Sequence, residues 1–201
     1  SADGAFGHDV AIDDDYVLVG APQNSLGIGY IGNGEAYLFD KATGSLLHSF
    51  APPDGADAVF DDYGYSVDID NNLIVIGAPD RKRLGDEDES GPGKAYVYDV
   101  STGDLLRTLE DPSPILNGRF GYSVAIDNNQ ILIGNPRDDT NGHLTGQAYL
   151  FNATTGSLLF TLDDPVVSDP VHGDFFGQAV AMDDGKILVS APLDDSLASS
   201  G

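Results

Sequence analysis

The sequence predicts an all-β fold made of four-stranded antiparallel sheets, and three observations support this prediction. The 201 residues include 25 glycines and 11 prolines, a composition that favours turns. Of the 33 acidic side chains, 29 are Asp and four are Glu, and Asp is the poorer helix former of the two. One motif occurs four times, at spacings of 57, 57 and 56 residues. The chain therefore contains about 3.5 repeats of about 57 residues.

The repeat divides the chain into four units, the last of them incomplete. We place the units at residues 6–62, 63–119, 120–175 and 176–201, within one partial domain that spans residues 1–201. We call them units one to four. Each unit opens with an aromatic residue followed by Gly (Phe in three units, Tyr in unit two), and units one to three carry a second block, which begins at Gly34, Gly93 and Gly146.

The first half of each unit predicts a hairpin. Its first strand alternates polar and apolar residues, as at 122–126, and ends in an Asp- and Asn-rich turn whose residues tolerate positive φ. Its second strand is a run of Val, Ile and Leu that is typical of a strand buried on both faces. Proline, which cannot donate to a β-ladder, ends that strand. The turns lie at residues 13–15, 70–72, 127–129 and 183–185, and the second strands at 16–20, 73–77, 130–134 and 186–190.

The second half of each complete unit predicts another hairpin. An AYLF-type strand runs into Asp40, Asp99 or Asn152, whose side chain is expected to bond the following backbone, with a permissive Gly four residues later. A fourth strand of the SLLHSF type follows. Each sheet is apolar on both faces and needs neighbours on both sides, and radial packing into a β-propeller provides them.

The repeated motif resembles the FG-GAP repeat of integrin-α-like β-propellers. The resemblance implies a propeller, commonly seven-bladed, on extracellular or cell-surface proteins that mediate adhesion and ligand binding. Family members also occur as lectin-like domains and as non-catalytic parts of larger secreted proteins. The residues that carry the resemblance are Phe6, Gly7, Gly20, Ala21, Pro22, Tyr63, Gly64, Gly77, Ala78, Pro79, Phe120, Gly121, Gly134, Pro136, Phe176, Gly177, Ala191 and Pro192.

Calcium loops, which the resemblance implies between the first and second strands, are not matched here. Asp13 and Asp15 begin an alternation of carboxylates, but the next alternate position is Val17, inside the second strand. We interpret these segments as plain turns. No cofactor is required by the sequence, and bound calcium is the alternative.

Charge and composition exclude several partners. The formal net charge of −24 disfavours nucleic acid, because polyanions are bound through Lys and Arg and the chain has only nine of these. No stretch approaches the ~18 apolar residues of a membrane span, so we expect no direct membrane insertion. The absence of cysteine excludes disulfides and thiolate metal sites.

Variable loops at residues 23–33, 80–92 and 137–145 are expected to project from one face of the propeller, where binding sites often lie. The second loop places basic residues 81–83 beside acidic residues 86–89, which we interpret as a solvated, self-compensating loop. The acidic linkers at 54–62, 110–117 and 163–174 are interpreted as solvated turns, with a calcium site as the alternative. Asn152 begins a glycosylation sequon, but we favour a role as the turn residue that Asp40 and Asp99 supply elsewhere.

No catalytic or nucleotide-binding motif occurs in the sequence. We predict a non-enzymatic extracellular or cell-surface structural or interaction module, which binds a protein partner or self-assembles through propeller faces and open blade edges. A carbohydrate-binding, lectin-like propeller and a propeller segment of a larger secreted enzyme are the alternatives. A lectin is expected to repeat its ligand-facing residues, and these loops do not repeat. Because unit four lacks two strands, we expect either a piece of about seven repeats or a ring completed by a partner or a second copy.

Overall fold

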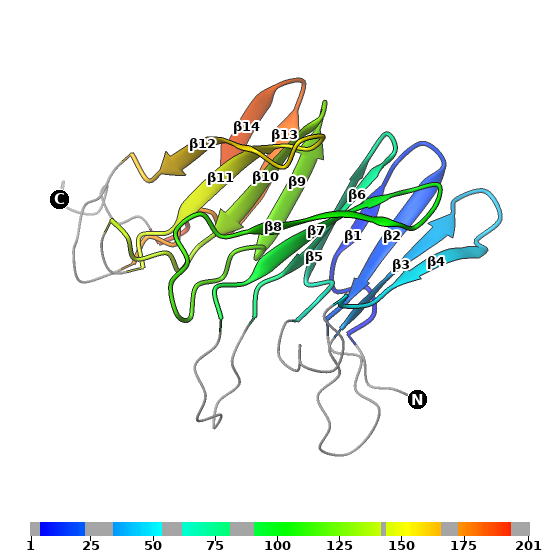
Figure 1. Ribbon diagram of the computed structural model, residues 1–201, viewed down its shortest axis with the longest axis horizontal. Helices are drawn as coiled ribbons and strands as arrows, with labels where there is room; N and C mark the ends of the chain where they lie inside the picture. The colour runs from blue at the N-terminus through cyan, green and yellow to red at the C-terminus, as the bar shows by residue number, and fades with distance from the viewer. Residues whose placement is uncertain are drawn as a thin grey trace, which may run out of the picture.

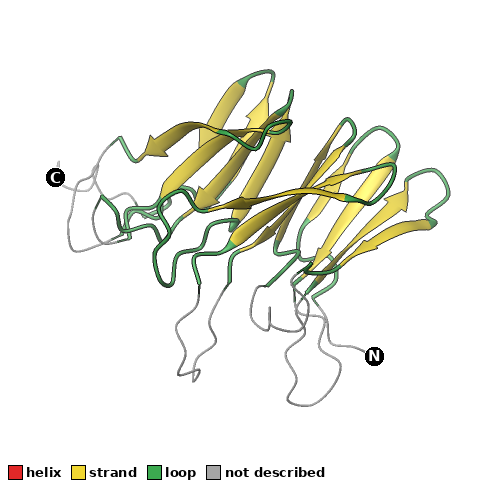
Figure 2. Ribbon diagram, viewed as in Figure 1, coloured by secondary structure: helices red, strands yellow, loops and turns green. Residues whose placement is uncertain are grey.

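The computed structural model describes residues 5–22, 34–53, 62–80, 91–141, 144–165 and 173–193. These residues form strands and turns, with no helix among them (Figure 2). Within these ranges there is accordingly no helix that is long and apolar enough to cross a bilayer. The all-β prediction is confirmed.

Fourteen strands form within the described residues, four in each of the first three units and two in unit four. Unit one contains β1 (Val10–Ile12), β2 (Tyr16–Ala21), β3 (Glu35–Asp40) and β4 (Leu46–Phe50). Unit two contains β5 (Ser66–Asp70), β6 (Leu73–Ala78), β7 (Lys94–Asp99) and β8 (Leu105–Glu110). Unit three contains β9 (Ser123–Asp127), β10 (Gln130–Asn135), β11 (Gln147–Asn152) and β12 (Leu158–Asp163). Unit four contains β13 (Val180–Asp183) and β14 (Lys186–Val189).

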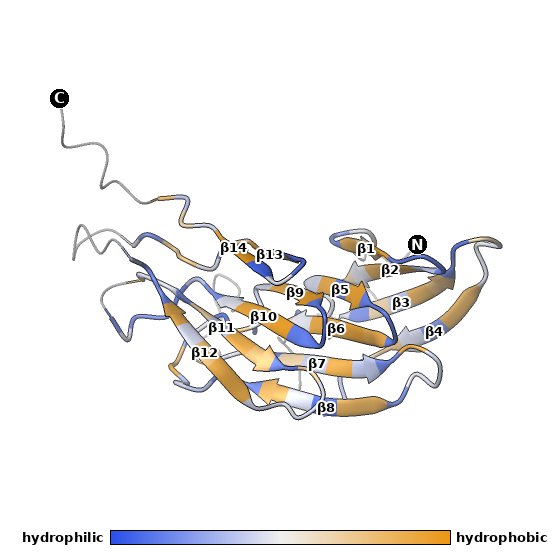
Figure 3. Ribbon diagram, turned by 90° about the horizontal axis from the view of Figure 1, so that it is seen from above, coloured by the Kyte–Doolittle hydropathy of each residue, from blue (hydrophilic) through white to orange (hydrophobic). Residues whose placement is uncertain are grey.

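Each unit is a separate antiparallel meander in which neighbouring strands in the sheet are also neighbours in the chain. The sheets stand beside one another in chain order, like the blades of an open propeller (Figure 1). Seen from above, the first strands β1, β5, β9 and β13 follow one side of the molecule, and the fourth strands follow the opposite side (Figure 3). The first strands therefore surround the propeller axis.

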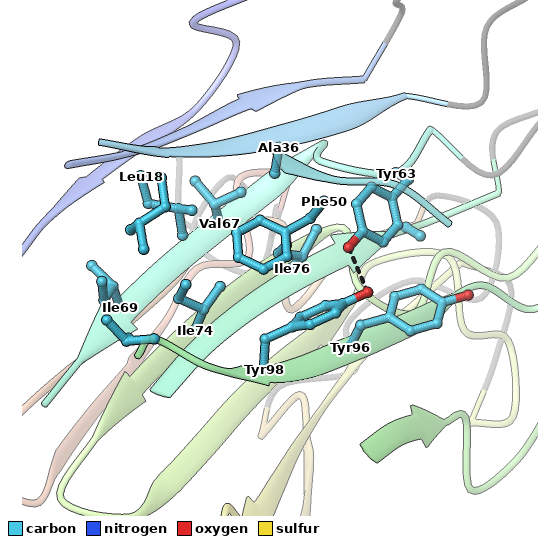
Figure 4. Packing of buried hydrophobic residues seen from close by; sticks show 13 residues of the cluster. Leu18, Ala36, Phe50, Tyr63, Val67, Ile69, Ile74, Ile76, Tyr96 and Tyr98 are labelled. Carbon is cyan, nitrogen blue, oxygen red and sulfur yellow. Dashed lines mark hydrogen bonds between the residues drawn. The ribbon is translucent and has the colours of Figure 1, made fainter. Parts of the chain in front are cut away.

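The hydrophobic core lies between successive sheets. Ile74 and Ile76 of β6 pack in the cluster shared with unit one, whereas Val75 packs in the cluster shared with unit three. The prediction that the second strand is buried on both faces is confirmed here. In the first cluster the hydroxyl groups of Tyr63 and Tyr98 are 2.8 Å apart and hydrogen-bonded, although both residues are buried among aliphatic and aromatic side chains (Figure 4).

The turns follow the sequence prediction in most units. Asn71, Asn128 and Asp184 adopt positive φ in the first hairpins of units two, three and four. Unit one differs, since none of residues 13–15 has a positive φ. The register is the same as in the other units, with Ile12 paired to Val17 and the N–H of Asp13 donating to the carbonyl of Tyr16 at 3.1 Å, so this turn closes over the same length without a left-handed residue.

The second hairpins are closed by the predicted Asx turns. The Oδ1 atoms of Asp40, Asp99 and Asn152 accept hydrogen bonds of 2.7, 3.0 and 2.8 Å from backbone N–H groups three residues later. The glycines that follow have left-handed φ values of 69°, 72° and 72° at positions 44, 103 and 156. Strands β2, β6 and β10 each end at the residue before a proline, as predicted.

The second strand of unit four is the exception to burial. Leu188 of β14 is 71% exposed, while Leu18, Val75 and Leu132 at the equivalent position are completely buried. The prediction of a strand buried on both faces is therefore wrong for residues 186–190. The physical reason is that no described sheet covers the outer side of unit four.

Candidate functional site

The repeated motif forms the joint between one unit and the next. Gly20 of unit one lies against the backbone carbonyl of Gly64 in unit two, and a side-chain Cβ at position 20 would fall far inside contact distance of that oxygen. Gly77 meets Gly121 in the same way, and Gly134 meets Gly177. The motif glycines therefore make room for the neighbouring unit rather than for a ligand.

The second glycine of each joint has a conformational reason as well. Gly64, Gly121 and Gly177 have φ values of 83°, 87° and 90°, which residues with a Cβ rarely adopt. A Cβ on Gly64 would also lie against the carbonyl oxygen of Glu35. The aromatic residue before each glycine forms an isolated parallel bridge to the preceding unit, at Gly34–Tyr63, Gly93–Phe120 and Gly146–Phe176.

Hydroxyl groups complete two of the three joints. Ser66 Oγ donates a hydrogen bond of 2.9 Å to the carbonyl of Gly121, and Ser123 Oγ donates one of 2.8 Å to the carbonyl of Gly177. Position 9 is the equivalent position in unit one and carries a carboxylate instead. Asp9 accepts at Oδ2 a 2.8 Å hydrogen bond from the backbone N–H of Val67.

A second carboxylate bridge joins units two and three. Asp68 accepts at Oδ1 from the N–H of Ile69 and at Oδ2 from the N–H of Ile126, at 2.9 and 2.7 Å. Burial raises the pKa of Asp68 to about 6, although both backbone hydrogen bonds act in the opposite direction. Sequence reasoning missed this role because the partner residue lies 58 positions further along the chain.

A groove runs along the propeller axis and is lined by the first strands of all four units. A row of rings stands at one end of these strands. The ring centroids of His8 and Tyr65 are 4.5 Å apart, those of Tyr65 and Tyr122 are 4.9 Å apart, and Gln178 takes the fourth position. Arg119 places its guanidinium carbon 5.7 Å from the centre of the Tyr122 ring. The row connects successive units and presents polar and aromatic groups to the groove.

A buried polar network surrounds Asn135, which replaces the alanine found at this motif position in the other units. Its Nδ2 donates to Asp111 Oδ2 at 2.9 Å, and its Oδ1 accepts from the backbone N–H of Arg119 at 2.8 Å. Tyr149 donates to Asp138 Oδ2 at 3.0 Å. Burial raises the pKa of Asp111 to about 6. The network ties the linker after β8 to the end of β10, and the departure from Ala at position 135 is its only sequence signal.

A family comparison agrees with this geometry. The model of the FG-GAP repeat matches residues 1–39, 48–98, 117–151 and 166–201, which together make up most of the chain. The chain belongs to the FG-GAP repeat family. The resemblance and the propeller-type fold predicted from the sequence are thereby confirmed. A search among curated proteins finds no match. FG-GAP repeats are typical of extracellular and cell-surface proteins, and their propellers are often protein-interaction modules that are typically not enzymes.

The FG-GAP joints account for the burial of one face of units two and three. Tyr63, Val67 and Ile69 of unit two are at most 6% exposed because unit one covers them. Phe6, Val10 and Ile12 at the equivalent positions of unit one are 61%, 61% and 63% exposed. We call these three side chains the unit-one face.

Several predicted candidates fall outside the described residues. These are the loop at 23–33, the charged residues 81–90, residues 54–61 of the first linker, and residues 166–172 of the third. Among the residues that the structure does describe, no three His, Asp or Glu side chains are grouped to hold a metal ion. Asn152 lies at the end of β11, where its Oδ1 also accepts from Thr155 Oγ1 at 3.0 Å. The turn role favoured for Asn152 is confirmed, and glycosylation stays a prediction.

Proposed function

We propose that this FG-GAP chain is a non-enzymatic extracellular or cell-surface interaction module, which binds a protein partner or a second copy through the unit-one face. The single observation that carries this proposal is the exposure of Phe6, Val10 and Ile12. Their equivalents are buried in units two and three and partly buried in unit four, where a preceding unit covers them, so the unit-one face is an apolar surface suited to contact with another protein surface.

The shape of the unit-one face favours a protein rather than a small molecule. Val10 and Ile12 project from a β-strand at alternate positions, and Phe6 adds a ring at the end of the strand. Such a flat apolar surface resembles the inner faces of a β-sandwich, which pack against another sheet. A partner that supplies an apolar sheet face, with few acidic side chains around it, fits a chain with a net charge of −24.

The test compares two pairs of substitutions. Val10→Asp with Ile12→Asp places charges on the unit-one face, and Leu47→Asp with Leu106→Asp places the same charges on exposed leucines of the outer strands β4 and β8. Association is measured by sedimentation velocity for self-association, and by surface binding to a panel of purified extracellular proteins. We expect the first pair to weaken association at least about tenfold and the second pair to leave it unchanged. Equal effects of the two pairs, or no association of the wild type in either assay, would refute the proposal.

A carbohydrate ligand is the second candidate, and the ring row of the axial groove favours it. The variable loops do not repeat their residues, but the position shortly before the first strand carries a ring in three of the four units, at His8, Tyr65 and Tyr122. Repeated aromatic side chains are what a lectin-like propeller is expected to present. Glycan-array binding that is lost in Tyr122→Ala and kept in Val10→Asp would support this candidate, and an empty array would remove it.

A further inference from the structure

The fourth unit departs from the other three at one position that forms a joint with a following unit, and from units two and three at a second. Gly20, Gly77 and Gly134 each lie against a carbonyl of the next unit, and the fourth unit has Ser190 at this position. Ser66 and Ser123 each donate a hydroxyl hydrogen bond to the same carbonyl, and the fourth unit has Ala179 there.

The first of these positions requires glycine because of limited space and not because of backbone conformation. Gly20, Gly77 and Gly134 do not have the positive φ that excludes other residues. In each case the obstacle to a Cβ is the backbone carbonyl of the next unit, which cannot rotate away as a flexible side chain does. In two of the three cases a serine hydroxyl additionally holds that carbonyl in place.

Ser190 itself is held within its own unit. Its Oγ accepts a 2.9 Å hydrogen bond from the backbone N–H of Ala179, and its backbone N–H donates to the carbonyl of Ala179 at 2.9 Å. Its carbonyl accepts from the N–H of Gly177 at 2.9 Å. The strand end is therefore well ordered by bonds inside unit four, and its Cβ occupies the place that the motif glycine leaves empty elsewhere.

We propose that Ser190 and Ala179 are specificity-determining residues that prevent the outer face of unit four from receiving another FG-GAP unit in the joint geometry used between units one and four. Two copies of this chain consequently do not stack head to tail, with the unit-one face of one copy on unit four of the other, through such a joint. This inference concerns a different face from the proposed function and does not depend on it.

The first test moves the unit-four residues into an existing joint. The variant Gly134→Ser with Ser123→Ala recreates them between units three and four. We expect hydrogen exchange to accelerate at least about tenfold in β13 and β14, while β5 to β8 keep their protection. Ser190→Gly is the matched control and should leave the protection of β5 to β12 unchanged. Protection of β13 and β14 within about twofold of the wild type would show that the joint accepts serine and would overturn the proposal.

The second test leaves the joints between units unchanged. It therefore does not require a variant with an altered joint to fold. Leu188→Asp places a charge on the outer face of unit four, two residues before Ser190 in the chain. We expect the sedimentation profile of Leu188→Asp to match that of the wild type at every concentration. Self-association that both Leu188→Asp and Val10→Asp abolish would demonstrate head-to-tail pairing and would overturn the proposal. Self-association that only Val10→Asp abolishes supports both the proposed function and this inference. Because head-to-tail pairing would overturn this inference but not the proposed function, the two can fail separately.

Discussion

Asp68 and Ile126 are joined across two sheets by a 2.7 Å hydrogen bond from the backbone N–H of Ile126 to Oδ2 of Asp68. The first strand of each unit is an edge strand, and its outward N–H groups have no strand partner. The carboxylates of Asp9 and Asp68 occupy this position, each accepting from its own strand and from the next unit. Acidic side chains thus act as connectors around the axis.

The buried carboxylate of Asp68 makes stability depend on pH. Its pKa is raised to about 6 in the folded chain, above the value of about 3.9 expected when unfolded. The folded state therefore binds the proton more tightly, and the free energy of unfolding falls as pH rises from about 4 to about 6. We expect Asp68 to account for about 1–2 kcal/mol of this fall, after allowance for partial solvent screening.

Urea unfolding of the wild type and of Asp68→Asn, measured at several pH values between about 4 and 7, checks this prediction. The fall in stability should be smaller in the variant. Asp104→Asn, on the exposed turn between β7 and β8, is the control and should keep the wild-type dependence. Parallel pH profiles of wild type and Asp68→Asn would contradict the assignment.

Substitutions of Gly64 and Gly44 distinguish the stability cost of steric crowding from the cost of backbone conformation. Both have left-handed φ, but a Cβ on Gly64 would meet the carbonyl of Glu35, and a Cβ on Gly44 would meet nothing within 4 Å. Gly44→Ala should cost about 1 kcal/mol of unfolding free energy, the usual cost of the left-handed conformation. Gly64→Ala should cost at least about 3 kcal/mol, because a backbone contact between units must also open. Similar losses in chemical denaturation would show that the joint is not tight.

Asn152 is expected to act through its side-chain oxygen. Asn152→Asp keeps an acceptor for the N–H of Thr155 and reproduces the residue found at positions 40 and 99, so its stability should stay within about 0.5 kcal/mol of the wild type. Asn152→Ala removes the acceptor and should cost about 1 kcal/mol. Thermal melts measure both, and equal stability of the two variants would contradict the turn role. Mass spectrometry after expression in a secretory host tests glycosylation separately.

Salt should stabilise the chain by screening its own charge. A net charge of −24 on 201 residues repels itself in the compact state, and added NaCl shortens the range of this repulsion. We expect the melting temperature to rise steadily with NaCl. Calcium at micromolar concentration should add nothing beyond its ionic strength, with EDTA as the control. A calcium-dependent rise that EDTA reverses would instead demonstrate specific sites.

Much of the fold follows from local sequence patterns. Runs such as residues 73–77 predict strands buried on both faces, and Asx residues followed by Gly predict the closing turns. Both features depend on residues within a few positions of one another, and the structure has both. The exposed strand β14 differs, because the presence of a neighbouring sheet is not a local property, and the lack of a positive φ in the turn of unit one has no structural explanation.

The candidate site could not be predicted to the same extent. The sequence alone established the repeat, the all-β class, the FG-GAP resemblance and the turn chemistry, since each depends on short-range residue patterns or on the spacing of the repeat. Only the tertiary structure decided why Gly20 must be glycine, that Asp68 connects two units, and that no described unit covers the unit-one face. Each of these depends on contacts between units, between residues about 40 to 60 positions apart, and their distances and burial arise only when the sheets pack against one another.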